Sequence, residues 1–219
     1  MHVVVFAAGT LRPGRAVDEA VTSADLVIAA DGGAATARRY GCMPAIIVGD
    51  FDSLPARELA AMQQAGEQDG IEIIRVAAEK DETDTELALQ VALERGASRI
   101  TLLGALGGAR FDHTMANVLL LADFAAVPIR IVDGPSLCWL LRGPGSTSIH
   151  GQRNDLLSLL PLTSEATGVR TTNLYYPLHG ETLRFGRARG VSNVLTGPRA
   201  VVSLESGLLL VIHTATQEL

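Results

Sequence analysis

Four short motifs in the first half of the chain combine carboxylates with glycines and a few cations. They are Asp31–Gly33, Gly49–Ser53, Lys80–Asp84 and Arg110–His113. Three of them follow apolar runs that we expect to be buried strands. In an open α/β sheet, the carboxyl ends of the strands line one crevice, and ligands bind there. Acidic groups gathered at that edge repel one another unless a cation lies among them, so the motifs indicate a divalent metal site.

The pair of aspartates in Asp50–Phe51–Asp52 is the sharpest of these signals. Side chains two residues apart in an extended segment lie on the same face, so both carboxylates can reach one ion. Gly49 lets the backbone bend as the strand leaves the sheet. The alternative is a plain turn, with one solvated aspartate and one that caps a following helix.

The acidic segment 79–86 has two interpretations. Thr83–Glu86 has the form of a capping box, and acids at a helix start are favoured by the helix dipole. A solvated helix start therefore explains the segment. Asp84 could equally face the crevice and complete a metal shell with the Asp50–Asp52 pair, which would leave Lys80 to meet a phosphate.

Phosphate contacts are suggested by two glycine-containing turns and by several arginines. Asp31–Gly33 precedes an expected helix whose first N–H groups can bind a phosphate, although an ordinary turn explains it as well. The glycine-rich loop before Arg110 lacks the Lys-Ser/Thr ending of a Walker A loop. Arg110 suits bidentate contact with a phosphate, and Asp112 is a metal ligand, a substrate ligand or a helix cap. Arg12 and Arg15 are further phosphate candidates.

Short apolar runs alternate with helical patterns over residues 1–134. The runs are continuously apolar, as expected for parallel strands covered by helices on both faces. The expected strands are His2–Ala8, Leu26–Asp31, Ala45–Asp50, Ile71–Val76, Arg99–Ala105 and Pro128–Val132. The expected helices are Val17–Ala24, Ala34–Tyr40, Pro55–Gly66, Thr83–Arg95 and Asp112–Ala126. This alternation predicts an α/β domain with a doubly wound, mostly parallel sheet.

The pattern changes after Gly134, where the chain becomes rich in Gly, Pro, Ser and Thr and lacks a long helical pattern. The expected strands there are Leu137–Leu141, Leu156–Leu160, Gly168–Leu174, Glu181–Phe185, Ala200–Glu205 and Leu208–His213. Ser206–Gly207 suits a tight turn between the last two. We therefore expect an α/β domain over residues 1–134 and a small all-β sandwich over residues 135–219.

Composition narrows the possible functions. The chain has 219 residues, of which 47% are hydrophobic, so it can bury a large core. Its net charge of −6 argues against a nucleic-acid binder that depends on neutralising phosphates. Cys42 and Cys138 suggest neither a disulfide framework nor a zinc site. No basic leader and no apolar run near the roughly 20 residues of a membrane span is present, so we expect a cytoplasmic protein without nucleic-acid or membrane partners.

Taken together and in this order, the motifs resemble the thiamine pyrophosphokinase (thiamine diphosphokinase) family. The matches are Asp31–Gly33 to its DGG turn, Gly49–Ser53 to GDFDS, Asp81–Asp84 to D-x-T-D, and Gly107–His113 to G-G-R-x-D-H. Further matches in the tail are Tyr176–Leu178, Leu183, Gly186 and Gly190–Asn193. The chain departs from the family in two places: Ala109 is inserted before Arg110, and Lys80 stands where many relatives carry Gln.

The resemblance implies a homodimeric enzyme that uses Mg²⁺ and transfers the diphosphate of ATP to the hydroxyl of thiamine, giving thiamine diphosphate and AMP. It implies that the catalytic residues are Asp50, Asp52, Asp84 and Arg110, the three aspartates being the metal ligands. The residues implied to bind ATP and its phosphates are Asp31, Gly32, Lys80, Thr83 and Arg110. Those implied to bind thiamine, between the α/β domain of one subunit and the sandwich of its partner, are Asp112, Ser192 and Asn193.

Three other functions stay open at this point. A haloacid-dehalogenase-like phosphatase would use Asp50 as a covalent nucleophile and Asp52 as its acid/base. Leu54, however, stands where that family places Thr or Val. A related diphosphokinase acting on a pterin alcohol would share the α/β site. A nucleotide- or thiamine-sensing module would bind without turnover, although such a module needs fewer carboxylates in one cleft.

Overall fold

The chain folds into two compact units, Met1–Gly134 and Pro135–Leu219, in a computed structural model that describes residues 1–51, 64, 66 and 70–218. Most of the expected helix Pro55–Gly66 lies outside the described residues, as do Asp52 and Ser53. No helix in the described part of the chain is long and apolar enough to cross a membrane.

Six parallel strands form the sheet of the first unit, in the spatial order β4-β3-β2-β1-β5-β6. They are β1 (His2–Phe6), β2 (Leu26–Ala30), β3 (Ile46–Gly49), β4 (Glu72–Arg75), β5 (Arg99–Leu103) and β6 (Ile129–Asp133). The chain moves outward from β1 to β4 and then returns to place β5 on the other side of β1. This reversal is a topological switch point, where open α/β sheets bind ligands. The doubly wound sheet that the sequence predicts is confirmed.

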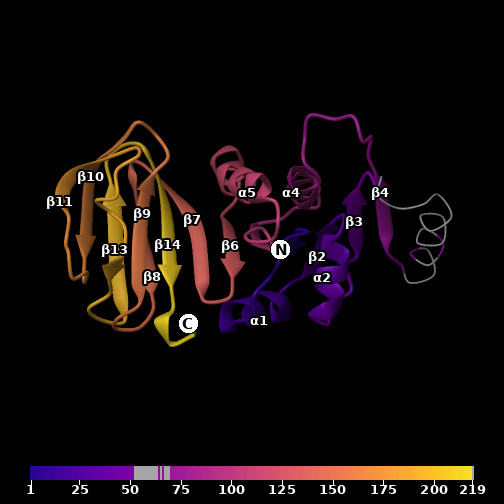
Figure 1. Cartoon of the computed structure of the whole chain (residues 1–219), viewed down its shortest axis with the longest axis horizontal. Coiled ribbons are helices and arrows are strands. Elements are labelled where there is room, and N and C mark those ends of the chain that lie inside the picture. Colours follow the sequence, from indigo (N-terminus) through magenta and orange to yellow (C-terminus); the bar gives the residue numbers. More distant parts are fainter. Residues whose placement is uncertain (52–63, 65, 67–69, 219) are drawn as a thin grey trace. The chain divides into compact units, whose positions relative to one another are not determined.

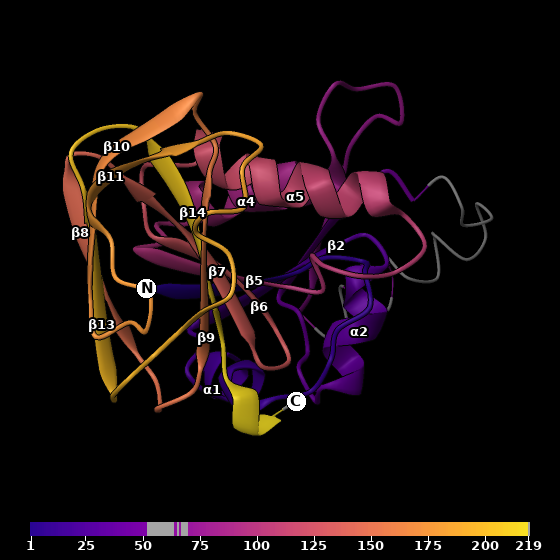
Figure 2. The same cartoon turned by 60° about the vertical axis from the view of Figure 1, so that its left-hand side comes forward.

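Helices cover both faces of this sheet. Those described are α1 (Arg15–Thr22), α2 (Gly33–Arg39), α4 (Asp84–Glu94) and α5 (Phe111–Asp123). α4 and α5 lie together on one face and α1 and α2 on the other (Figures 1 and 2). At the start of α4, the Thr83 hydroxyl oxygen accepts a hydrogen bond of 3.2 Å from the N–H of Glu86, which confirms the expected N-cap.

The first five strands of this sheet end one or two residues earlier than the sequence predicts, and after two of them the chain turns sharply at the carboxyl edge of the sheet. β2 ends at Ala30 and not at Asp31, whose φ is 44°. β5 ends at Leu103 and not at Ala105, because Gly104 has a φ of 66°. Such angles do not occur in strands. The residues after these strands are thereby directed out of the sheet, where ligands can reach them.

The loop after β1 lies in direct backbone contact with the loop after β5. The N–H of Ala7 donates to the carbonyl of Leu103 at 2.8 Å, and that of Gly9 to the carbonyl of Gly104 at 2.9 Å. A Cβ on Gly9 would meet the Gly104 carbonyl oxygen closer than real Cβ atoms approach other atoms. A Cβ on Gly104 would lie 2.6 Å from the Ala7 carbonyl oxygen. Both glycines are therefore required for the two loops to meet at the switch point.

Replacing Gly9 with alanine is expected to destabilise the first unit by about 1–3 kcal/mol, because the added methyl group must push the Gly104 carbonyl away. A lower midpoint of thermal denaturation, followed by circular dichroism, would show this. Gly197→Ala is the matched control, because a Cβ at Gly197 has no neighbour within 4 Å. Equal midpoints for the two variants would mean that the contact does not constrain the fold.

The second unit is a β-sandwich, as the sequence predicts. One antiparallel sheet has the strand order β12-β9-β14-β7 and the other β11-β10-β13-β8. The strands are β7 (Ser136–Arg142), β8 (Gly145–His150), β9 (Leu156–Pro161), β10 (Glu165–Thr172), β11 (His179–Arg184), β12 (Asn193–Val194), β13 (Arg199–Leu204) and β14 (Leu208–Thr214). Leu157 and Val211 from the first sheet and Val169 and Val202 from the second belong to one buried cluster. This apolar layer is the core of the unit.

The sequence analysis missed two strands of the sandwich, β8 and β12. β8 has the sequence Gly-Ser-Thr-Ser-Ile-His, and only Ile149 in it is buried. β12 is two residues long. β8 is held by its pairing with β13 over six positions, and β12 by its pairing with β9. Neither strand has an apolar pattern of its own, so only the tertiary structure reveals them.

A buried aspartate ties the C-terminal segment to the turn before β9. Asp155 Oδ2 accepts a hydrogen bond from the N–H of Gln152 at 2.7 Å and lies 3.0 Å from Nε2 of His213. Its Oδ1 accepts the N–H of Thr216 at 3.1 Å. Burial opposes ionisation of Asp155, but these hydrogen bonds outweigh burial and lower its pKa. The charged carboxylate therefore stabilises the folded unit.

The contribution of Asp155 to stability should depend on pH. A carboxyl group whose pKa is lowered by folding stabilises the protein above its unfolded value, near 3.9, and this contribution is lost as the pH falls through the folded value. Asp155→Asn should therefore be less stable than the unaltered protein at neutral pH, by about 1–3 kcal/mol. Urea unfolding at neutral pH and near pH 3 measures the difference, which should shrink in acid. A difference that is the same at both values would contradict this account.

Candidate active site

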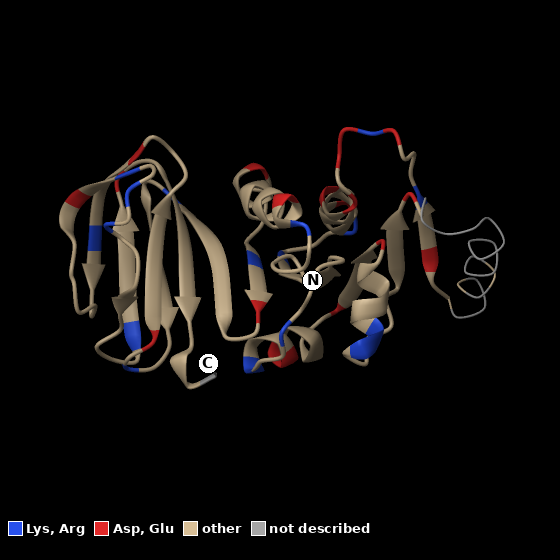
Figure 3. Cartoon of the chain, in the orientation of Figure 1, with Lys and Arg blue, Asp and Glu red and all other residues tan. Residues whose placement is uncertain are grey.

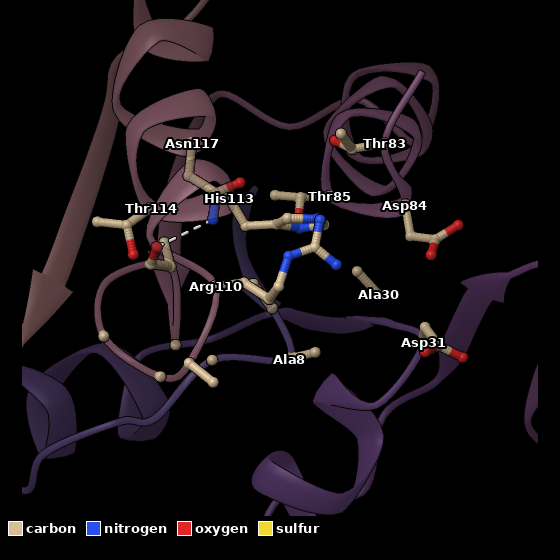
Figure 4. Close-up of a pocket in the computed structure, with 17 residues that line it drawn as sticks. Ala8, Ala30, Asp31, Thr83, Asp84, Thr85, Arg110, His113, Thr114 and Asn117 are labelled. Atoms are coloured by element: carbon tan, nitrogen blue, oxygen red, sulfur yellow. Dashed lines mark hydrogen bonds between the residues drawn. The ribbon is translucent and has the colours of Figure 1, made fainter. Parts of the chain in front are cut away.

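A cavity of about 240 Å³ opens at the switch point, at the carboxyl ends of β1 and β5. Backbone from the loops after these two strands lines it, and polar side chains from several segments face it. Those side chains are Asp31, Thr83, Asp84, Thr85, Arg110, His113, Thr114 and Asn117. Figure 4 shows Asp31 and Asp84 on one side, His113, Thr114 and Asn117 on the other, and Arg110 between them. The cavity therefore combines acidic, basic and hydroxyl groups from distant parts of the sequence.

One ammonium group lies between two of the expected metal ligands. Lys80 Nζ is 3.1 Å from Asp50 Oδ2 and 3.0 Å from Asp84 Oδ1, and no more than a quarter of any of these side chains is exposed. Burial opposes the charge on Lys80, but the carboxylates of Asp84 and Asp50 outweigh burial and raise its pKa. Figure 3 shows the connection from β4 to α4 with acidic residues on either side of a basic one. Two carboxylates thus share one cation at the edge of the sheet.

The oxygen atoms around Lys80 suit a hard divalent cation. The contact between Lys80 and Asp84 lies outside hydrogen-bond geometry, so Asp84 Oδ1 is buried without a hydrogen-bond donor among the described residues. A buried oxygen that lacks a donor, close to a second carboxylate, is what a Mg²⁺ ligand requires. No group of three potential metal ligands occurs among the described residues. The oxygens of Asp50 and Asp84 suit the expected metal site, but metal binding by these two residues stays a prediction, as does the third ligand Asp52, which lies outside the described residues.

Asp31 lies at the neighbouring strand end and lines the same cavity. Its N–H donates to the carbonyl of Val48 at 2.8 Å, which extends the pairing of β2 with β3 by one residue. A Cβ on Gly49 would lie 3.3 Å from Asp31 Oδ1, so this carboxylate stands beside the strand end that leads to Asp50. Gly32 follows as the residue before α2, but it does not line the cavity.

Arg110 and Asp112 form an ion pair at the mouth of the cavity. Arg110 Nη2 donates to Asp112 Oδ2 at 2.7 Å, and its Nε donates to Oδ1 at 2.9 Å. This pairing lowers the pKa of Asp112 to about 2 and raises the pKa of Arg110. Both side chains are more than 60% exposed, so water screens the pair and an anion can compete for the guanidinium. Arg110 lines the cavity and Asp112 does not.

The loop before Arg110 accommodates the inserted residue Ala109 through two glycines. Gly107 and Gly108 have φ angles of 79° and 98°, and Ala109 itself lines the cavity. The inserted residue is therefore accommodated with Arg110 still lining the cavity.

The two other arginine candidates are engaged elsewhere in the first unit. The backbone N–H and Nε of Arg12 each donate to the carboxylate of Asp133 at 2.8 Å. Arg15 pairs with Glu19 at 2.8 Å on the exposed side of α1. Neither arginine lines the catalytic cavity. Their contacts hold local structure, so the structure gives no support to phosphate binding by these two residues.

The sequence analysis did not identify the α5 side of the cavity. Thr114 and Asn117 lie three residues apart, on one face of the helix. Asn117 is buried, and its Nδ2 donates to the carbonyl of Ala105 at 2.9 Å, which fixes the glycine-rich loop against the helix (Figure 4). The signal that could have revealed them is this short polar stripe in an otherwise apolar helix.

In the second unit, Ser192 and Asn193 hold a turn that carries two exposed tyrosines. The N–H of Ser192, whose φ is 58°, donates to Ser158 Oγ at 3.0 Å. Asn193 is buried; its Oδ1 accepts the N–H of Tyr176 at 3.0 Å, and its Nδ2 donates to the carbonyl of Tyr176 at 2.7 Å. The rings of Tyr175 and Tyr176 meet edge to face, with centroids 4.8 Å apart. Asn193 therefore positions the tyrosine turn, and its contact with thiamine stays a prediction.

Two family models match the chain. Residues 17–132 match the model described as "Thiamin pyrophosphokinase, catalytic domain". Residues 146–209 match the model described as "Thiamin pyrophosphokinase, vitamin B1 binding domain". The first match falls in the α/β unit and contains the cavity residues from Asp31 onward, and the second falls in the sandwich.

Individual relatives agree with the family models. The chain is 30% identical over 192 residues to the thiamine pyrophosphokinase of Bacillus subtilis, covering 86% of this chain and 87% of the relative. A crystal structure of thiamine pyrophosphokinase from Bacillus subtilis aligns with a TM-score of 0.83 at 28% identity, covering 98% of this chain and 99% of the other. The thiamin pyrophosphokinase of Geobacillus thermodenitrificans aligns with a TM-score of 0.81 at 30% identity, covering 98% of each chain. These findings support neither the haloacid-dehalogenase-like phosphatase nor the pterin diphosphokinase, and the chain belongs to the thiamine pyrophosphokinase family.

Proposed function

We propose that the protein is a thiamine diphosphokinase, which transfers the terminal diphosphate of ATP to the hydroxyl of thiamine and releases AMP. The observation that carries the proposal is the pair Asp50 and Asp84, held around one cation, with Asp84 lining the same cavity as Arg110. This set of charges suits a metal–triphosphate complex. The matches to a catalytic and a vitamin B1 binding family model support thiamine as the acceptor.

Each charged residue has a role that follows from its position. Asp50, Asp84 and the predicted ligand Asp52 would hold Mg²⁺, which when bound offsets the charge of the transferred phosphates. Lys80 lies about 3 Å from both described carboxylates and can turn its ammonium to an incoming phosphate oxygen. Arg110 can exchange its exposed partner for a phosphate, to which a guanidinium binds in bidentate fashion.

Positioning of the two substrates supplies most of the remaining catalysis. The thiamine hydroxyl attacks the β-phosphorus in line, the bond from that phosphorus to the oxygen of the α-phosphate breaks, and AMP leaves with that oxygen. The proton of the hydroxyl passes to a cavity carboxylate or to solvent. Thr83 accepts the N-cap hydrogen bond and keeps its own O–H for a phosphate oxygen. Asp31 and Asp112 would orient the substrates.

We also propose that the active form is a cytoplasmic homodimer, with thiamine bound by the segment that includes Ser192 and Asn193. The vitamin B1 binding match covers this segment and the exposed Tyr175 and Tyr176, whose ring faces suit a thiazolium cation. Cys42 and Cys138 are both free thiols, as a reducing compartment favours.

Product formation tests the proposed reaction. Purified protein incubated with ATP, Mg²⁺ and thiamine should form AMP and thiamine diphosphate in equal amounts, and a pterin alcohol should not replace thiamine. Asp84→Asn should lower kcat by about 100-fold or more, because it removes a charge that stabilises the transition state. Glu82→Gln, an acid-to-amide change in the same loop but outside the cavity, is the control. Absence of both products from the unaltered protein would exclude the proposal.

Metal binding tests the role of Asp50 and Asp84. Lys80→Met leaves two carboxylates without their shared cation, so the variant should bind Mn²⁺ more tightly than the unaltered protein. The expected gain is about 5- to 30-fold, which corresponds to about 1–2 kcal/mol. Titration calorimetry on the nucleotide-free protein measures it. The double variant Lys80→Met/Asp84→Asn should lose the gain; if it binds as tightly as the single variant, Asp84 is not a ligand.

The oligomeric state tests the homodimer. One chain has a mass of 23.0 kDa. Light scattering during size-exclusion chromatography should give twice this mass. A single-chain mass at the concentration of the activity assay, with turnover intact, would remove the homodimer from the proposal without affecting the reaction.

A further inference from the structure

Of the 18 lysine and arginine residues in the chain, Lys80 is the only lysine. The two kinds of cation are not interchangeable, because a guanidinium is a flat fork that suits one carboxylate, whereas an ammonium is a compact charge. Arg95, for example, donates from one nitrogen to both oxygens of Glu72, at 2.7 and 2.8 Å. Lys80 instead lies 3.1 Å from an oxygen of Asp50 and 3.0 Å from an oxygen of Asp84. Its ammonium therefore stands between two carboxylates as a small monovalent ion would.

The segment that carries Lys80 is held at its two ends. The N–H of Val76 donates to the carbonyl of Gly49 at 3.1 Å, and Thr83 caps α4. Between them, residues 77–82 make no backbone hydrogen bond with any described residue. Among the described residues, the polar side-chain contacts of this segment are the two that Lys80 makes. The ammonium can therefore change partners without breaking any of the backbone hydrogen bonds found in the described part of the chain.

The ammonium and a divalent metal ion would compete for the same oxygens. Asp84 Oδ1, which lies 3.0 Å from Nζ of Lys80, is the buried oxygen that lacks a hydrogen-bond donor among the described residues. The side chains of Lys80, Asp50 and Asp84 are 13%, 19% and 25% exposed, so water screens charges only partly here. Two cations within a few ångströms of each other repel strongly in such surroundings. Lys80 therefore disfavours a metal ion that arrives alone.

A triphosphate changes this balance. Asp84 lines the catalytic cavity and Lys80 does not, so the ammonium must turn away from the carboxylates to reach a phosphate in the cavity. In turning, it leaves the carboxylate oxygens to the metal ion and gains an anionic partner in exchange. The negative charge of the phosphates also offsets the repulsion between the ammonium and the metal ion.

We infer that Lys80 holds the place of the divalent cation before the nucleotide binds and moves to the phosphates when metal and nucleotide are both present, so that each ligand strengthens the binding of the other. The inference rests on the proposed function, since it concerns the metal and the nucleotide of that reaction. Coupling of this kind is reciprocal, so the nucleotide raises the affinity for metal by the same factor as the metal raises the affinity for nucleotide. Lys80 thus makes the metal–nucleotide complex the species that the site selects.

Two affinities measured by calorimetry on the full chain test the coupling. One is for Mn²⁺ alone and the other is for the Mn²⁺ complex of α,β-methylene-ATP, in which the bond that the reaction breaks is replaced by a stable one. Lys80→Gln should bind Mn²⁺ alone about 5- to 30-fold more tightly, because the competing cation is gone. It should bind the complex about 3- to 10-fold more weakly, because a phosphate contact is lost. The ratio of the two affinities should therefore fall by about 15-fold or more.

The opposite signs of the two changes separate this role from simpler ones. If both affinities fall, Lys80 only supports the structure; if both rise, it repels the metal throughout and does not move. If the affinity for Mn²⁺ alone is unchanged, Lys80 does not hold the metal's place. Each of these results overturns the inference. Arg75→Gln is the matched control, because it removes the same charge from an exposed side chain at the end of β4 and should change neither affinity by more than about twofold.

Movement of the ammonium can be followed directly, because a protein grown on lysine labelled with ¹³C at Cε gives a single lysine signal. The Mg²⁺ complex of α,β-methylene-ATP should shift this signal, and the same concentration of Mg²⁺ alone should not. If the complex leaves the signal in place, Lys80 stays between the carboxylates and the inference is overturned. Failure of the proposed function is distinguishable: both experiments measure binding, so these changes would still be seen in a protein that forms no thiamine diphosphate.

Discussion

Two carboxylates at the edge of a sheet can lie close together only if a cation lies between them, and in this protein the cation is Lys80. Its ammonium is about 3 Å from Asp50, which follows β3, and from Asp84, the first residue of α4. The attraction fixes the start of α4 relative to the end of β3, and with it the side of the cavity on which Asp84 lies. In this arrangement a buried oxygen of Asp84 has no hydrogen-bond donor among the described residues, which supports the proposed metal site.

The cavity itself depends on how closely the backbone can approach at the switch point. Gly9 and Gly104 let the loops after β1 and β5 touch, and residues of both loops line the cavity. Larger residues would separate the loops and change the shape of the cavity. One backbone contact therefore sets the geometry of the region that is proposed to hold the phosphates.

The sequence predicted the fold well where local pattern and tertiary structure agree. The continuously apolar strands of the first unit and the N-cap at Thr83 are local signals, and they appear as expected. The predicted positions of the strand ends were less accurate. The end of β2, for example, is set by the positive φ of Asp31, which depends on the turn that follows. Within the site, the sequence could nominate Asp50, Asp84 and Lys80 but could not show that the lysine lies between the acids. The polar stripe of α5 is visible in the sequence, but the contact of Asn117 with the carbonyl of Ala105 depends on the tertiary structure and could not be predicted.

Charge balance explains what Lys80 contributes between Asp50 and Asp84. Asp50, Asp84 and the predicted third ligand Asp52 would carry three negative charges, which one ammonium and one divalent cation would neutralise together. A neutral glutamine at that position would leave one carboxylate uncompensated until the nucleotide arrived. With Lys80 present, the catalytic cavity is closer to neutral before the triphosphate enters. Arg110 is exposed and, among the described residues, pairs with Asp112 alone, so it remains as the cation whose partner can be exchanged for a phosphate.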